Sequence, residues 1–265
     1  VFFPSSGTGA WEAALVNIVS EGEKILMFET GQFSTLWKNM AEKLGFDVIY
    51  IQSDWRTGID ENKISQIIKD DKNHEIKAVC LVHNETSTGV TSKIPSTIKK
   101  IKSLNHPAII MVDTISSLGS IDYSHDDWLV DVTIGGSQKG LMLPPGIAFN
   151  FISKKALEIS KLNSFKKSYW DWNEMVMNNT NGFFPYTPST NILFGLKEAL
   201  RLIELEGLQN IFDRHTRHAK ATRLAVKSWG IELLPVNEDE YSNSLTSLLF
   251  TSGINADYLR KIILE

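Results

Sequence analysis

Ala108-Ile109-Ile110-Met111-Val112-Asp113 is an apolar run that ends in a carboxylate, and a second run, 130–134, continues into Gly135-Gly136-Ser137-Gln138-Lys139-Gly140. An unbroken apolar run such as 108–112 is typical of a strand that is buried on both faces of a sheet, and 130–134 is also predicted to be a strand. Segments with helical spacing separate most of the strand-like runs of the chain, so the dominant pattern is strand, helix, strand. We therefore predict an α/β fold with a mostly parallel sheet and helices on both faces. The predicted strands are 24–28, 48–51, 78–82, 108–112, 130–134 and 147–152, and the predicted helices are 9–19, 33–44, 60–69, 94–104 and 154–161.

The pattern changes after Pro188. Helices are expected over 191–206 and 208–228, separated by Gly207, followed by strands over 231–234 and 245–250 and a helix over 255–264. We interpret this as a large domain (1–190), connecting helices (191–228) and the start of a smaller α+β C-terminal domain (229–265). Both ends of the chain resemble interrupted elements, so we expect a fragment that lacks an N-terminal segment.

Composition excludes several classes of function. The net charge of −4 over 265 residues gives no reason to expect a nucleic-acid partner. The apolar runs are far too short to cross a membrane. Cys80 is the single cysteine, which excludes an internal disulfide and a cysteine metal cluster, and no metal is expected. A cytoplasmic location is expected, although a targeting signal could precede Val1.

Ligands of parallel α/β sheets bind at the carboxyl ends of the strands. Asp113 and Lys139 both follow strands there, and they are the two groups that an enzyme using pyridoxal 5′-phosphate (PLP) needs. The lysine amine bonds to the cofactor aldehyde, and the aspartate keeps the pyridine nitrogen protonated so that the ring accepts electrons. The alternatives are a capping or turn role for Asp113 and a solvated loop position for Lys139.

Four further segments are compatible with such a site, and each has a simpler structural explanation. Ser5-Ser6-Gly7-Thr8-Gly9-Ala10 precedes a helix and could receive a phosphate, or could be only a glycine-rich turn. Phe33 could stack on a planar ring or belong to the core. The segment 83–90 contains Thr86, which could donate to the cofactor's phenolic oxygen or belong to a turn. The aromatic segment 183–189 could be a linker. Their order along the chain, together with Asp113 and Lys139, favours the cofactor site.

In these segments the sequence resembles class V aminotransferases. The resemblance lies in 6–15, 83–90, Val112-Asp113 with Ser116-Ser117-Leu118-Gly119, and Gly136-Ser137-Gln138-Lys139. Within the family, the sequence most resembles the serine–glyoxylate and alanine–glyoxylate branch. Inside this branch, the segments 31–34, 83–86, 184–189 and 223–226 are most similar to the serine–glyoxylate enzymes. The resemblance covers essentially the whole chain.

The resemblance implies a fold-type-I PLP-dependent transferase that works as a homodimer. It makes Lys139 the Schiff-base lysine, pairs Asp113 with the pyridine nitrogen and stacks Phe33 on the ring. It assigns phosphate contacts to Thr8, Gly9 and Gln138 and a backbone contact to Ala10, and it places Thr86 near the ring oxygen. Thr187 would reach the phosphate of the partner subunit. The implied cofactor-binding set is Thr8, Gly9, Ala10, Phe33, Thr86, Asp113, Ser137, Gln138, Lys139 and Thr187.

The resemblance further implies transamination from an amino acid, serine or alanine, to a 2-oxo acid such as glyoxylate. A cysteine desulfurase or another PLP lyase on the same fold is an alternative, since a fold does not determine a reaction. A catalytically weak PLP-binding fragment is another. The family's N-terminal segment is absent before Val1, and the arginines present do not match the motif that grips the substrate carboxylate, which we expect beyond Glu265.

Overall fold

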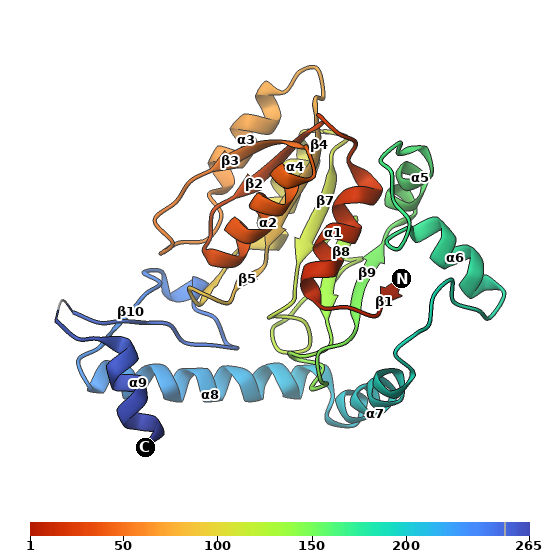
Figure 1. Cartoon of the computed structure of the whole chain (residues 1–265). Helices are drawn as coiled ribbons and strands as arrows, with labels where there is room; N and C mark the ends of the chain where they lie inside the picture. The colour runs from red at the N-terminus through yellow and green to blue at the C-terminus, as the bar shows by residue number, and fades with distance from the viewer. Residues whose placement is uncertain (252) are drawn as a thin grey trace.

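The structure, a computed structural model, describes residues 1–251 and 253–265. A twisted sheet crosses the middle of the molecule, with helices on either side and a long helix running beneath it (Figure 1). In the described residues this sheet has seven strands in the order β1-β9-β8-β7-β4-β2-β3. These strands are β1 (Phe2–Phe3), β2 (Lys24–Phe28), β3 (Asp47–Ile51), β4 (Ile76–Val82), β7 (Ile109–Asp113), β8 (Val132–Gly136) and β9 (Ala148–Ile152).

The pairing of the strands determines where their polar ends meet. The strands β3, β2, β4, β7 and β8 pair in parallel, whereas β9 and β1 are added antiparallel at one edge. Val82 is in register with Asp113, and Asp113 with Ile134. The carboxyl ends of β4, β7 and β8 therefore lie side by side, and the predicted mostly parallel sheet is confirmed.

Helices cover both faces of the sheet, as the sequence predicted. Along β4, Ala78, Cys80 and Val82 face one core cluster while Val79 and Leu81 face the other, as alternation along a strand requires. The first face is covered by α1 (Gly7–Ile18), α2 (Gln32–Lys43), α5 (Lys154–Leu162) and α6 (Trp172–Thr180). The second is covered by α3 (Glu61–Asp70) and α4 (Ile94–Ser103).

The helices on the second face show why these sequences fold as they do. Ile64 and Ile68 of α3, and Ile94, Ile98 and Ile101 of α4, recur at three- and four-residue spacing and are almost fully buried. Burying each such side chain stabilises the fold by about 1.5–3 kcal/mol. The helix start predicted at Asp60 is also confirmed, because its carboxylate accepts from the N–H groups at positions 62 and 63.

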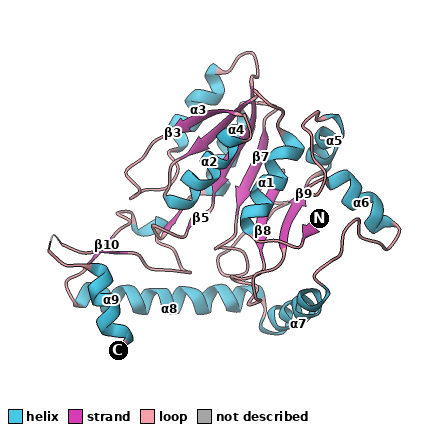
Figure 2. Ribbon diagram, in the orientation of Figure 1, coloured by secondary structure: helices cyan, strands magenta, loops and turns pink. Residues whose placement is uncertain are grey.

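The C-terminal part consists of short elements attached to two long helices, α7 (Thr190–Glu206) and α8 (Leu208–Ser228) (Figure 2). The hairpin of β10 (Glu232–Leu233) and β11 (Leu248–Leu249), a 3-10 turn (Glu238–Glu240) and α9 (Ala256–Leu264) follow. Arg56 Nε donates to the Leu234 carbonyl at 2.8 Å, and the Arg56 guanidinium also pairs with Glu232. These contacts fasten the hairpin to the loop after β3. None of the described helices is long and apolar enough to span a bilayer.

A few elements of the structure were not predicted from the sequence, and others were predicted to be longer than they are. The strands predicted over 231–234 and 245–250 each shrink to two residues. The helix α6 was not predicted, because three asparagines interrupt its apolar spacing; in the structure Asp171 caps it. The short hairpin of β5 (Asn84–Glu85) and β6 (Val90–Thr91) was also missed, because its strands are too short to show alternation.

Candidate active site

A cleft with about 550 Å³ of open space lies at the carboxyl ends of β4, β7 and β8. The N-terminus of α1, the start of α2 and the loop that follows β4 enclose it. Six of the residues singled out from the sequence line this cleft: Thr8, Phe33, Thr86, Asp113, Gln138 and Lys139. Segments that are up to 131 positions apart in the chain, from Thr8 to Lys139, therefore converge on one site.

Asp113 is a buried carboxyl at the floor of the cleft, with 4% of its surface exposed. The indole Nε1–H of Trp11 donates to Oδ2 at 2.7 Å, and the backbone N–H of Ile115 donates to Oδ1 at 2.7 Å. Burial raises the pKa of the Asp113 carboxyl to about 7, although these two donors act to lower it. No lysine or arginine in the described ranges forms an ion pair with it. The carboxyl therefore needs a cation from outside the described chain to be fully ionised at neutral pH.

The N-terminus of α1 opens into the same cleft. The first bond inside this helix runs from Ala10 N–H to the Ser6 carbonyl, at 3.2 Å. The N–H groups of Gly7, Thr8 and Gly9 thus have no partner within the helix, and Ser6 provides no side-chain cap. Uncapped N–H groups and the positive end of the helix dipole favour an anion here.

Aromatic rings form one wall of the cleft. Phe33 is half-buried at the start of α2, with its ring centroid 6.5 Å from that of Trp11. Trp11 is itself stacked on Trp37, with the centroids 6.0 Å apart and the ring planes 14° from parallel. Both Phe33 and Trp11 line the cleft, so a planar ligand bound there could pack against an aromatic ring.

Lys139 is exposed on the turn after β8. It borders the cleft and also a neighbouring hollow with about 920 Å³ of open space, whose far wall includes Arg214 and His215 of α8. Thr86 lines both spaces. The Lys139 amine thus lies where a molecule entering through the larger hollow would meet one held in the cleft.

The remaining predicted residues do not line the cleft. Gly9 and Ala10 are buried within α1. Ser137 is buried, and its Oγ donates to the Pro144 carbonyl at 2.7 Å, so it fixes the turn that carries Lys139. Thr187 is exposed on the connection between α6 and α7. Their roles toward a cofactor stay predictions.

The cleft residues that were not identified as site residues from the sequence include Trp11, Asn84 and Ser116. Trp11 lies within the helix predicted over 9–19 and received no role from the sequence, because its bond to Asp113 depends on tertiary packing. Asn84 donates through Nδ2 to Ser116 Oγ at 2.9 Å and to Ser244 Oγ at 3.0 Å, which ties the cleft to the C-terminal part. Ser116 lay within a segment noted from the sequence but received no role there.

Comparison with known proteins shows the family. The family model "Aminotransferase class-V" matches residues 1–264. This chain belongs to the class-V aminotransferases. It is 44% identical over 98% of its length to a serine–glyoxylate aminotransferase of Hyphomicrobium methylovorum, and 44% identical over 96% to one of Arabidopsis thaliana. It spans 64% and 63% of the lengths of these two relatives.

Among solved structures, the fold is similar to that of an alanine–glyoxylate aminotransferase of Nostoc sp., with a TM-score of 0.91 and 27% identity. This match covers the whole of this chain and 70% of that one. The α/β fold predicted from the sequence is confirmed by this likeness.

Family membership implies PLP, and the residues present fit it. The buried Asp113 carboxyl lacks a cation that a protonated ring nitrogen would supply. The open end of α1 lacks an anion that a phosphate would supply. The buried Gln138 Oε1 has no hydrogen-bond partner among the described residues, so this acceptor could receive a hydrogen bond from a ligand in the cleft. The described residues contain no group of three or more histidine, cysteine or acidic side chains arranged to hold a metal ion.

Proposed function

We propose that this chain is the PLP-binding part of an aminotransferase that transfers the amine of serine or alanine to a 2-oxo acid such as glyoxylate. One observation carries the proposal. A buried carboxyl without a cationic partner and an exposed lysine border the same cleft, at the ends of two adjacent parallel strands. The similarity to serine–glyoxylate aminotransferases supports the choice of substrates.

The chain's own residues suit the different parts of the cofactor. When bound, PLP supplies a protonated conjugated ring that accepts electrons from the substrate's α-carbon. Asp113 would hold the proton on the ring nitrogen, and the Trp11 indole orients Asp113 by donating to Oδ2. The N–H groups of Thr8 and Gly9 and the side chain of Gln138 would hold the phosphate. Phe33 would cover one ring face and Thr86 would lie at the ring oxygen.

Lys139 has two successive tasks in this proposal. Its amine would hold the cofactor through the aldehyde carbon until a substrate amine takes that place. The same amine, once free, would act as the base that moves the proton of the substrate's α-carbon. The position of Lys139 between the cleft and the larger hollow is compatible with both tasks.

The same proposal includes a homodimer. Thr187 is exposed and lies outside the cleft of its own chain, as expected for a residue that reaches the partner's phosphate. The division into 1–190, 191–228 and 229–265 and the cytoplasmic location stay predictions. A catalytically weak PLP-binding protein is the alternative to this proposal.

A desulfurase requires a reactive thiol, and the sequence has one cysteine. Cys80 is 2% exposed within β4, and burial raises the pKa of its thiol far above its usual range. Cys80 is therefore not an accessible nucleophile, which argues against a desulfurase reaction that uses this residue.

Amine transfer can be tested directly. The chain is saturated with PLP and mixed with serine or alanine, and formation of hydroxypyruvate or pyruvate is followed with the change in visible absorbance. Lys139→Ala is expected to abolish both signals, whereas Lys161→Ala, on the exposed surface of α5, should retain them. Full 2-oxo acid formation by Lys139→Ala would refute the proposed mechanism.

A further inference from the structure

Helix α2 begins at a residue that has no side chain to cap it. Its N-cap position is Gly31, which has no side chain to accept from the N–H groups of the first turn. Those groups belong to Gln32, Phe33 and Ser34. Gln32 is exposed, but Phe33 is half-buried and Ser34 is buried, so an uncapped helix end would leave at least these last two donors unsatisfied inside the protein. One of the three is the amide of the aromatic residue that lines the cleft.

Two residues of the β5–β6 hairpin, more than 50 positions away in the chain, satisfy all three donors. Gln32 N–H donates to Ser87 Oγ at 2.8 Å. Phe33 N–H donates to Glu85 Oε1 at 3.3 Å, and Ser34 N–H donates to Glu85 Oε2 at 3.0 Å. Ser87 Oγ in turn donates to Glu85 Oε1 at 2.7 Å. We call Glu85 and Ser87 the α2 clamp.

The clamp is closely packed. Glu85 is fully buried, and its negative charge lies at the positive end of the α2 dipole. A Cβ on Gly31 would come within 2.4 Å of Ser87 Oγ and 2.6 Å of Glu85 Cγ. Only glycine at position 31 therefore lets the hairpin approach the helix this closely.

The clamp also determines how two cleft residues lie relative to one another. Thr86 is the residue between Glu85 and Ser87, and it lines the cleft together with Phe33. The carboxylate of Glu85 holds the amide of Phe33 directly. One buried side chain thus links the two walls that would enclose the cofactor ring.

We propose that Glu85 is a positioning residue for the cofactor, which holds Phe33 against one face of the ring and Thr86 at its edge. This inference rests on the proposed function, since it assigns the ring to the cleft. The proposed role differs from simple stabilisation, because loss of Glu85 should alter the ring's environment more than it alters the fold.

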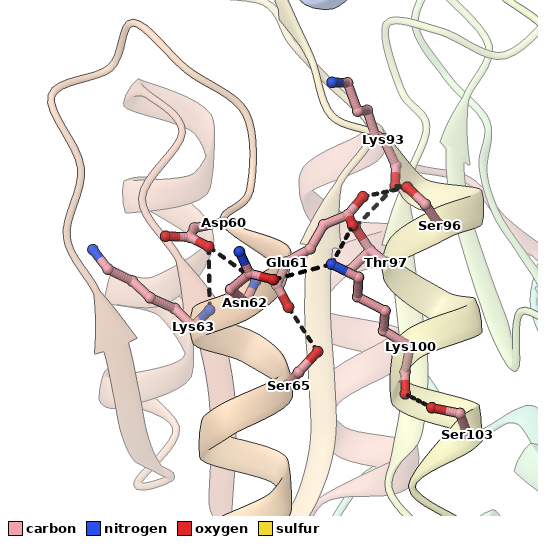
Figure 3. A network of polar contacts seen from close by, with 10 residues as sticks. All are labelled: Asp60, Glu61, Asn62, Lys63, Ser65, Lys93, Ser96, Thr97, Lys100 and Ser103. Atoms are coloured by element: carbon pink, nitrogen blue, oxygen red, sulfur yellow. Dashed lines mark hydrogen bonds and ion pairs between the residues drawn. The ribbon is translucent and has the colours of Figure 1, made fainter.

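A matched control is available elsewhere on the sheet. Glu61 of α3 also joins two segments through several polar contacts: it hydrogen-bonds Ser96 and pairs with Lys100 Nζ at 2.9 Å (Figure 3). These contacts link α3 to α4 and do not line the cleft. Glu61→Ala therefore removes a comparable carboxylate without disturbing Phe33 or Thr86.

The test compares Glu85→Ala, Glu85→Gln and Glu61→Ala with the unaltered chain. Glutamine keeps an acceptor for Phe33 N–H but turns an NH2 group toward Ser34 N–H. In the PLP-free chain, NMR amide exchange at Ser34 should therefore accelerate at least about tenfold in Glu85→Gln, with less effect at Phe33. Visible absorbance and circular dichroism then report PLP affinity and the asymmetry around the ring.

We expect Glu85→Ala to raise the PLP dissociation constant about tenfold or more and to diminish the visible dichroism, because charge-assisted bonds are lost. Glu85→Gln should be intermediate, and Glu61→Ala should stay within about twofold. If Glu85→Ala does not fold, the PLP affinity and the visible dichroism of Glu85→Gln provide the test. A folded Glu85→Gln with unchanged Ser34 exchange would overturn the inference, as would unchanged PLP affinity and dichroism. If the unaltered chain binds no PLP, the proposed function fails. The exchange rate of the Ser34 amide in the PLP-free variants then still tests whether Glu85 caps α2.

Discussion

Asp113→Asn should change how the stability of the PLP-free chain depends on pH. Burial raises the pKa of this carboxyl from 3.8 to about 7 in the folded chain. Between these values the folded chain holds a proton that the unfolded chain has lost. The contribution of Asp113 to stability is therefore fully present below pH 3.8 and is lost as the pH rises to about 7.

The size of the effect follows from the shift. The difference between about 7 and 3.8, at about 1.36 kcal/mol per pKa unit, corresponds to about 4 kcal/mol as an upper limit. His83 acts in the opposite direction, because burial lowers the pKa of its imidazole from 6.5 to about 4. Its contribution is lost as the pH falls from 6.5 to about 4, so the two slopes partly cancel in the unaltered chain.

The difference between variant and unaltered chain isolates Asp113. Urea unfolding at several pH values from 4.5 to 8 would give the free energy of unfolding of both proteins. The stability of Asp113→Asn relative to the unaltered chain should increase by several kcal/mol across this range. Saturating PLP should remove the trend, since a cationic ring nitrogen keeps Asp113 ionised. A difference that stays constant with pH in the PLP-free proteins would refute the reasoning.

Three other substitutions or treatments give further tests. Trp11→Phe removes the donor to Asp113 Oδ2 and should lower the free energy of unfolding by about 1–3 kcal/mol in urea and weaken PLP binding. Gly31→Ala forces a Cβ against Glu85 Cγ, so urea unfolding should show a loss of about 1–3 kcal/mol; an unchanged midpoint would contradict the packing. Cys80 should not react with a thiol reagent until denaturant is added, because it is buried and burial raises the pKa of its thiol; fast reaction of the native chain would show that β4 opens.

The sequence predicted the parts of the site that depend on local pattern. Asp113 and Lys139 could be found because each follows an apolar run, and in a parallel sheet the ends of such runs meet at one edge. Thr8 could be found because small residues precede a helix. Each of these signals lies in the short stretch of sequence around the residue that it identifies.

The contacts that position these groups could not be predicted in the same way. The bond from Trp11 to Asp113 joins residues 102 positions apart, and its donor lies on a helix whose apolar spacing already explains a tryptophan. Glu85 caps a helix that begins more than 50 residues earlier, so no local capping pattern reveals it. The role proposed for Thr187 requires a second subunit, whose position the sequence of one chain does not reveal.

Reduction of the PLP-treated chain with borohydride, followed by peptide mass mapping, tests the central claim most directly. We predict a yellow protein whose reduced adduct lies on Lys139, the lysine that borders the cleft containing Asp113. The absence of an adduct, or an adduct confined to other lysines, would contradict the assignment of this cleft as the cofactor site.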